Sequence, residues 1–142
     1  TINTPSMLAV EDYLLALAWA RSVGGLKGLV ARADANAAVL AKAVDHHDWL
    51  DHLAVDPATR SNTSVCLKFN DPRIKDGAAF AKALVKRLDT EGVAYDMGAY
   101  RDAPPGLRIW CGGTVETSDL EALMPWIEWA FECEIAALSE AA

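Results

Sequence analysis

The sequence predicts an α+β domain in which helices pack on one face of a short antiparallel or mixed sheet. The chain of 142 residues has the length of one ordinary domain, and 52% hydrophobic residues are enough to form a core. Helical and strand-like periodicities follow one another in the order α-α-β-β-α-β-β-α. Strand pairs that alternate with single helices favour an α+β arrangement.

Two helices are predicted in the first third of the chain. The first begins with Thr4 as N-cap and Pro5 at the first helical position, and it ends at Gly24-Gly25. The second runs from about Leu26 to Asp45 and is rich in alanine, which favours a helix. The first helix is apolar on more than one face, so we expect it to pack against another lobe.

Strand patterns and two further helices fill the rest of the chain. Strands are predicted at Leu53–Val55, Thr63–Phe69, Val93–Met97 and Leu107–Cys111. Phe80 and Leu88 mark the apolar side of a third helix that is closed by Gly92. The capping box Ser118-x-x-Glu121 predicts the start of the last helix, and Pro125 is expected to bend that helix or to shift its start.

Charge and cysteine content narrow the class of protein. A net charge of -7 argues against a general nucleic-acid binder, because phosphate contacts need clustered Lys and Arg. No apolar run reaches the length of a membrane span, and no signal peptide is visible. Cys66, Cys111 and Cys133 are odd in number and show no C-x-x-C spacing, so we expect free thiols, buried as small hydrophobes, and a cytoplasmic location.

The segment from Tyr100 to Arg108 is the most informative one for function. Arg101 and Arg108 lie on either side of a stiff Pro-Pro-Gly turn, and Arg108 lies within an apolar strand. A buried guanidinium needs a partner, and its planar fork suits a carboxylate. That carboxylate belongs either to a ligand or to an Asp or Glu of the chain, and the residues alone leave both open.

Other polar segments are less specific. Asn3-Thr4-Pro5-Ser6 at a helix start suits either an anion such as phosphate or simple N-capping. The run Arg60–Ser64 reads as a turn that enters a strand. His46, His47 and His52 have no spaced carboxylate or cysteine to complete a metal site, so we expect solvated surface residues. No complete catalytic motif is present, and no catalytic residue is assigned.

Three motifs together resemble the phosphoserine aminotransferase family, which comprises class V, fold-type I enzymes that use pyridoxal 5'-phosphate. They are Asn3–Met7, Val55–Ser64 and Gly98–Gly112. The resemblance covers essentially the whole chain and only the C-terminal part of the family's polypeptide. It implies that residues 1–45 are a helical segment leading from the lobe that carries the cofactor, and that residues 46–142 form the small C-terminal α+β domain.

The resemblance also implies a role for individual residues. Asn3 and Thr4 would bind the phosphate of the neighbouring subunit's pyridoxal phosphate, so that a homodimer shares each site. Arg108 would pair with the α-carboxylate of the substrate. Tyr100 and Arg101 would line the pocket for the substrate's distal phosphate or carboxylate, and many relatives have His in place of Tyr100.

The implied reaction belongs to serine biosynthesis: an amino group passes between glutamate and 3-phosphohydroxypyruvate. Pyridoxal phosphate acts as the electron sink in such reactions. The family's Schiff-base lysine precedes the segment seen here, and the chain begins at Thr1 as the middle of a longer polypeptide would. We therefore expect the 142-residue chain alone to be inactive.

Two alternatives stay open on the residues. One is a different class V enzyme, such as an alanine–glyoxylate aminotransferase or a relative of the cysteine desulfurases. The other is a free-standing α+β regulatory module, in which Arg101 and Arg108 would hold a small anion without any catalysis.

Overall fold

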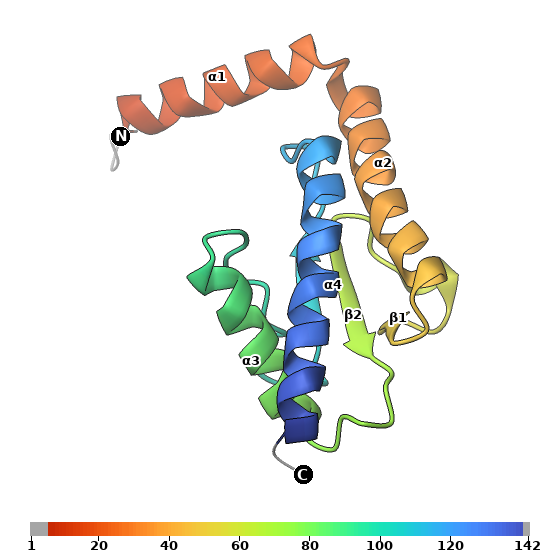
Figure 1. The fold of residues 1–142 in the computed structure, drawn as a ribbon. Helices are drawn as coiled ribbons and strands as arrows, with labels where there is room; N and C mark the ends of the chain where they lie inside the picture. Colours follow the sequence, from red (N-terminus) through yellow and green to blue (C-terminus); the bar gives the residue numbers. More distant parts are fainter. Residues whose placement is uncertain (1–5, 141–142) are drawn as a thin grey trace.

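The computed structural model describes residues 6–140, which form four α-helices, one short 3-10 helix and a three-stranded sheet (Figure 1). In chain order the elements are α1 (Met7–Ser22), α2 (Gly25–His46), β1 (Leu50–His52), η1 (Pro57–Thr59), β2 (Ser64–Phe69), α3 (Gly77–Thr90), β3 (Leu107–Trp110) and α4 (Thr117–Glu140). The predicted α+β class is confirmed.

The sheet is antiparallel in the order β1-β2-β3, and its two faces differ in polarity. Successive side chains of a strand point to opposite faces. In β3, Leu107 and Ile109 are buried in the core, whereas Arg108 lies on the opposite face, where its register partner on β2 is Cys66. The sheet therefore presents Arg108 on the face that lies away from the core.

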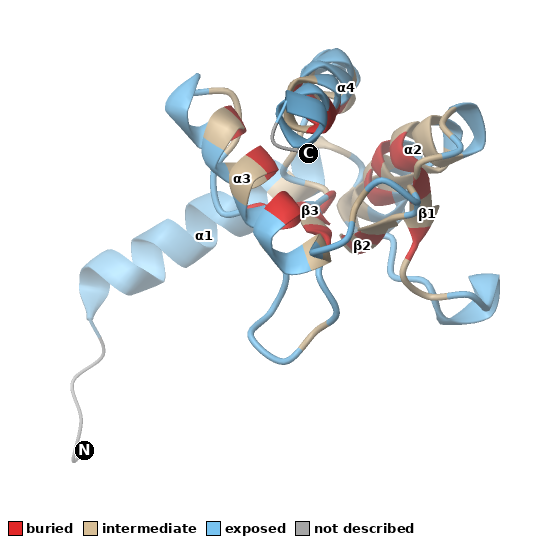
Figure 2. Ribbon diagram, turned by 60° about the horizontal axis from the view of Figure 1, so that its bottom comes forward, coloured by how far each residue is buried: buried red, intermediate tan, exposed pale blue. Residues whose placement is uncertain are grey.

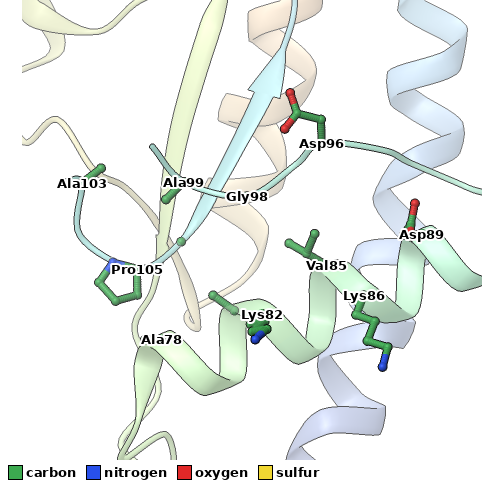
Figure 3. Close-up of a pocket in the computed structure, with 12 residues that line it drawn as sticks. Ala78, Lys82, Val85, Lys86, Asp89, Asp96, Gly98, Ala99, Ala103 and Pro105 are labelled. Atoms are coloured by element: carbon green, nitrogen blue, oxygen red, sulfur yellow. The ribbon is translucent and has the colours of Figure 1, made fainter. Parts of the chain in front are cut away.

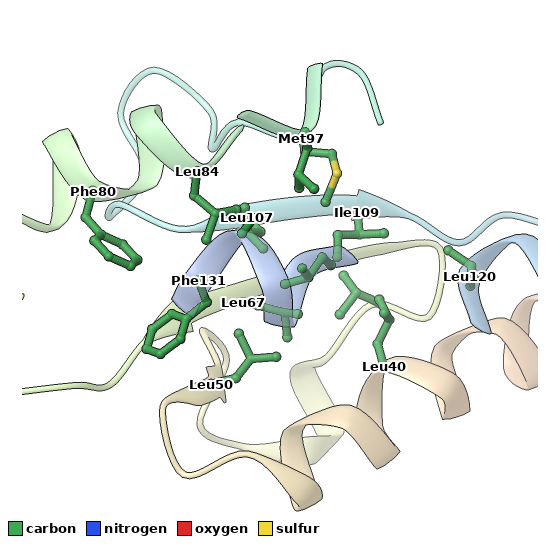
Figure 4. Close-up of a cluster of buried hydrophobic side chains, with 14 of the residues drawn as sticks. Leu40, Leu50, Leu67, Phe80, Leu84, Met97, Leu107, Ile109, Leu120 and Phe131 are labelled. Atoms are coloured by element: carbon green, nitrogen blue, oxygen red, sulfur yellow. The ribbon is translucent and has the colours of Figure 1, made fainter. Parts of the chain in front are cut away.

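Three helices cover the apolar face of the sheet. α4 lies between α2 and α3 and packs against both (Figure 1). Figure 4 shows the resulting core, in which Phe131 of α4 lies among leucines from the strands and from α2 and α3. The Phe131 ring stacks on Trp49 with 3.8 Å between ring centroids and meets Phe80 edge-on at 5.6 Å. Helices on one face of a short sheet are thus confirmed.

Helix α1 projects from this body and buries none of its own residues (Figure 2). It meets α2 at a bend of 76°, and its exposed apolar side chains include Met7, Leu8, Tyr13, Leu14, Leu15 and Trp19. No single described helix is long and apolar enough to cross a membrane; only α1 and α2 taken together pass that test, across their bend. The apolar surface of α1 agrees with the expectation that it packs against something else.

Two of the four predicted strands are wrong. The first strand lies at β1, three residues before Leu53–Val55, because Leu50 and His52 are the residues that face the core, while Val55 is 80% exposed. Val93–Met97 forms no strand, because Asp96 has a left-handed backbone with φ 53°. Only single contacts join this segment to β3, such as the Arg108 N–H that donates to the Met97 carbonyl at 2.8 Å.

The helix starts also differ from the prediction. α1 begins at Met7 and is capped by Ser6, whose hydroxyl accepts from the Ala9 N–H at 3.4 Å; Thr4 and Pro5 lie outside the described residues. α4 begins at Thr117, so Ser118 lies inside the helix instead of capping it. Pro125 lies within α4 without ending it.

His52 was expected at the surface, and the structure contradicts this because only 8% of the residue is exposed. Burial lowers its pKa below the ordinary value of 6.5, and the nearby positive charge of Arg60 lowers it further; Asp51 and Asp45 act in the opposite direction. The hydrophobic alternation of β1, which the turn signals around it obscured, places His52 on the core side.

We expect the stability of the chain to fall below pH 6.5 through His52. Since the folded state lowers the pKa of His52, the unfolded chain takes up a proton first as the pH falls. The contribution is fully present above the unfolded pKa of about 6.5 and is lost as the pH falls through the lowered folded pKa. Urea unfolding at pH 7.5 and 5.5 measures this, and His52→Leu should weaken the dependence. His46→Gln is the control. If the pH dependence of stability in His52→Leu equals that of the wild type, the effect belongs to other groups.

Candidate functional site

Arg108 lies at the centre of the candidate site, in the middle of β3 on the sheet face away from the core. Its side chain is 19% exposed. Gly106 sets the entry to this strand: a Cβ at this position would lie 2.0 Å from the Leu67 carbonyl oxygen, so only glycine lets the Pro-Pro-Gly turn approach β2 so closely. The turn and the antiparallel register together fix where Arg108 emerges from the sheet.

The guanidinium of Arg108 is held by the segment that precedes the Pro-Pro-Gly turn. Its Nη2 donates to the Asp96 carboxylate Oδ2 at 2.8 Å and to the Asp96 carbonyl at 3.1 Å, and Nε donates to the Gly98 carbonyl at 3.4 Å. It also lies 4.7 Å from the centroid of the Tyr100 ring. The hydrogen bond to Asp96 raises the pKa of Arg108 above its ordinary value, so the guanidinium stays charged.

Of the two partners that the sequence left open for Arg108, the structure contains the one within the chain, Asp96. The structure also brings Tyr100 to Arg108, as a ring under the guanidinium. Arg101 is exposed on the same loop and makes no ion pair or side-chain hydrogen bond within residues 6–140. Asn3 and Thr4 lie outside the described residues.

An open groove of about 600 Å³ runs between α3 and the loop that carries these residues (Figure 3). Lys82 and Lys86 of α3 line one side, and Asp96, Gly98 and the turn around Pro105 line the other. Asp96, the ion-pair partner of Arg108, is among the residues that line this groove, whereas Arg108 is not.

Sequence reasoning missed Asn36, which holds the chain just after β3 and is completely buried (0% exposed). Its Nδ2 lies within hydrogen-bond distance of the carbonyls of Cys111 at 3.2 Å, Gly112 at 3.3 Å and Val115 at 3.0 Å. Its Oδ1 accepts from the Thr117 hydroxyl at 2.7 Å. The signal was available, because an asparagine stands on the apolar stripe between Ala33 and Leu40 of an alanine-rich helix.

The remaining polar segments have structural roles. Arg60 donates from Nε to the Ala54 carbonyl at 3.1 Å, and the Ser61 hydroxyl accepts from the Ser64 N–H at 3.1 Å, which describes a turn as expected. Burial raises the pKa of the Cys111 thiol to about 11, so it remains protonated and is no nucleophile. Within residues 6–140, no group of His, Cys, Asp or Glu is suited to a metal ion.

No family model matches the chain, but curated proteins and solved structures do. It is 54% identical over 132 residues to the phosphoserine aminotransferase of Methanosarcina mazei, covering 93% of this chain and 34% of that protein. The phosphoserine aminotransferase of Listeria monocytogenes (strain EGD-e) is 29% identical over 126 residues, which is 89% of this chain and 32% of that protein. The chain thus spans about a third of the length of these relatives.

Solved structures show the same fold. The structure of phosphoserine aminotransferase from Bacillus circulans subsp. alkalophilus superposes with a TM-score of 0.78 at 23% identity, covering 92% of this chain and 34% of that one. The fold of the chain is therefore that of part of an aminotransferase structure. In sequence, the chain corresponds to the C-terminal part of phosphoserine aminotransferases.

Proposed function

We propose that the protein containing this chain transfers an amino group between glutamate and 3-phosphohydroxypyruvate, giving 2-oxoglutarate and phosphoserine. The observation that carries the proposal is the 54% identity to a phosphoserine aminotransferase over 93% of the chain. The outward position of Arg108 on β3 supports it, because a guanidinium fork on the sheet face away from the core suits a substrate carboxylate.

In this proposal Arg108 binds the α-carboxylate that both substrates carry. Tyr100 and Arg101, on the loop beside it, contact the distal phosphate or carboxylate. The Tyr100 ring lies against the guanidinium of Arg108, with 4.7 Å between the guanidinium carbon and the ring centroid. The assignment of Tyr100 and Arg101 rests on the sequence resemblance and on their place in this loop.

Pyridoxal 5'-phosphate is the proposed cofactor, and when bound it supplies an electron sink for the amino-group transfer. Asn3 and Thr4 are the proposed phosphate ligands. Their donor chemistry fits: an amide and a hydroxyl precede α1, and the first backbone N–H groups of a helix lack intrahelical partners and favour an anion. No lysine of this chain is proposed to bind the cofactor.

The proposed assembly is a homodimer in the cytoplasm, with each site shared between two subunits. Helix α1 supports this, because it follows Asn3 and Thr4 in the sequence and exposes the apolar side chains of Leu8, Leu15 and Trp19. A surface of this kind is typical of an interface rather than of a free monomer. The three free cysteines agree with a reducing compartment.

We expect the full-length protein to transaminate 3-phosphohydroxypyruvate with glutamate, and the 142-residue chain alone to be inactive. A coupled assay for 2-oxoglutarate measures both. A higher kcat/KM for glyoxylate than for 3-phosphohydroxypyruvate would favour the alanine–glyoxylate alternative. Activity of the 142-residue chain would contradict the placement of the Schiff-base lysine outside it. A full-length protein that binds anions without transamination would be the regulatory module.

A further inference from the structure

We propose that the Asp96 carboxylate is an internal competitor for the substrate: it pairs with Arg108 before a substrate binds, and a substrate carboxylate displaces it. The inference rests on the proposed function of Arg108 and adds to it a residue that sets the affinity of the site. Nothing in the resemblance or in the motif around Arg108 assigns a role to Asp96.

Arg108 makes two kinds of hydrogen bond: those to backbone carbonyls, which the fold maintains, and one to the Asp96 side chain, which a ligand can replace. The backbone carbonyls of Gly98, at 3.4 Å from Nε, and of Asp96, at 3.1 Å from Nη2, orient the guanidinium. Nη1 makes no hydrogen bond within residues 6–140. An entering carboxylate can therefore take Nη1 together with the Nη2 bond that Asp96 Oδ2 holds at 2.8 Å, while both backbone contacts stay in place.

Asp96 itself is poorly held apart from this one contact. Its side chain is 88% exposed, and Arg108 is its only ion-pair partner within residues 6–140. Figure 3 shows Asp96 across the groove from α3, with the side chain of Lys86 pointing away from it. An exposed carboxylate with one partner can swing into solvent with little change elsewhere.

The backbone of Asp96 indicates that this placement is maintained by the fold. Among the described residues it is the only non-glycine residue with a positive φ, at 53°. Asp and Asn tolerate this left-handed conformation better than other residues with a side chain, and such strained positions cluster at functional sites. An extended residue at this position, as the sequence predicted, would continue the strand and would not present both its carbonyl and its carboxylate to Nη2.

The ion pair between Asp96 and Arg108 has a physical reason before a substrate binds. Arg108 is only 19% exposed, and a partly buried guanidinium without a counter-charge is unfavourable. Asp96 supplies that counter-charge until a substrate does. Because both substrates carry the same α-carboxylate, the competition should weaken the binding of both to the same extent.

The test replaces Asp96 with Asn in the full-length protein, because Asn keeps the left-handed backbone and removes the charge. Asp89→Asn is the matched control: it removes the same charge on the α3 side of the same groove. Binding is measured by calorimetry with glutarate, a dicarboxylate that cannot be transaminated. We expect Asp96→Asn to bind glutarate about two- to fivefold more tightly, the range typical of releasing an exposed ion pair, and Asp89→Asn to be unchanged.

Kinetics give the second readout. The KM values for glutamate and 3-phosphohydroxypyruvate should both fall about two- to fivefold in Asp96→Asn, with kcat unchanged. Weaker glutarate binding or a higher KM would overturn the proposal and make Asp96 a residue that positions Arg108; unchanged affinity would overturn it as well. A wild-type protein without transaminase activity would refute the proposed function, whereas the glutarate measurement would still decide whether Asp96 competes for Arg108.

Discussion

Replacing Arg108 with Lys should raise the KM for glutamate and for 3-phosphohydroxypyruvate, each by about 10- to 100-fold, in the full-length protein. A lysine keeps the charge but cannot offer two parallel N–H groups to a carboxylate, and charge-assisted hydrogen bonds of this kind contribute about 1.5–3 kcal/mol each. It also cannot reach the carbonyls of Asp96 and Gly98 with the fixed geometry of a guanidinium. Steady-state kinetics with each substrate varied in turn measure the effect.

Arg101→Lys is the matched comparison on the same loop. Arg101 is exposed and has no side-chain partner within residues 6–140, so its replacement should leave the fold unchanged. If Arg101 contacts the distal group, the KM values of the two substrates should respond differently to Arg101→Lys, because one substrate carries a phosphate there and the other a carboxylate.

Equal KM values for wild type and Arg108→Lys, with matching thermal unfolding, would remove Arg108 from the substrate site.

The parts of the fold that follow from local periodicity were predictable. Residues 26–45 and the apolar positions around Phe80 show helical spacing, and both lie in helices, α2 and α3. β2 and β3 have alternating patterns and differ from their predicted ranges by one residue each. β1 was misplaced because a three-residue strand offers too few positions for an alternation to be recognised, and because its inward His52 is polar.

The partners of the site residues were not predictable in the same way. Arg108 could be recognised as needing a carboxylate. Its partner, Asp96, lies 12 positions earlier, and the contact depends on the left-handed backbone of Asp96 itself. The same backbone conformation explains why Val93–Met97 forms no strand. The contact between Asn36 and the chain after β3 spans 75 or more residues and arises only from the packing of α2.

Helix α1 shows how a local pattern can point beyond the chain. Its apolar residues occupy more than one face, and within residues 6–140 none of them is buried. Such a helix has no core to join in the described fold, so its apolar pattern suits packing against a surface outside it. This is why the sequence predicted an interface at α1 but not the partner that covers it.

The second large effect is expected at Asn36. Asn36→Leu should lower the free energy of unfolding of the 142-residue chain by about 2–4 kcal/mol, because it leaves the buried carbonyls of Cys111 and Gly112 and the partly buried carbonyl of Val115 without the Asn36 amide. Leucine has the same branching as asparagine and is larger, so no cavity forms, and the loss reports the missing hydrogen bonds together with any strain from the two methyl groups. Urea unfolding followed by circular dichroism at pH 7.5 measures it.

Thr117→Val separates the two halves of this network. It removes the hydroxyl that donates to Asn36 Oδ1 at 2.7 Å but leaves the amide contacts to the carbonyls, so we expect a smaller loss of about 1 kcal/mol. In the double variant the losses should be less than additive, because Asn36→Leu already removes the acceptor. Additive losses, or a loss below about 0.5 kcal/mol for Asn36→Leu, would mean that water replaces the amide and that α2 does not fix the end of β3 through this residue.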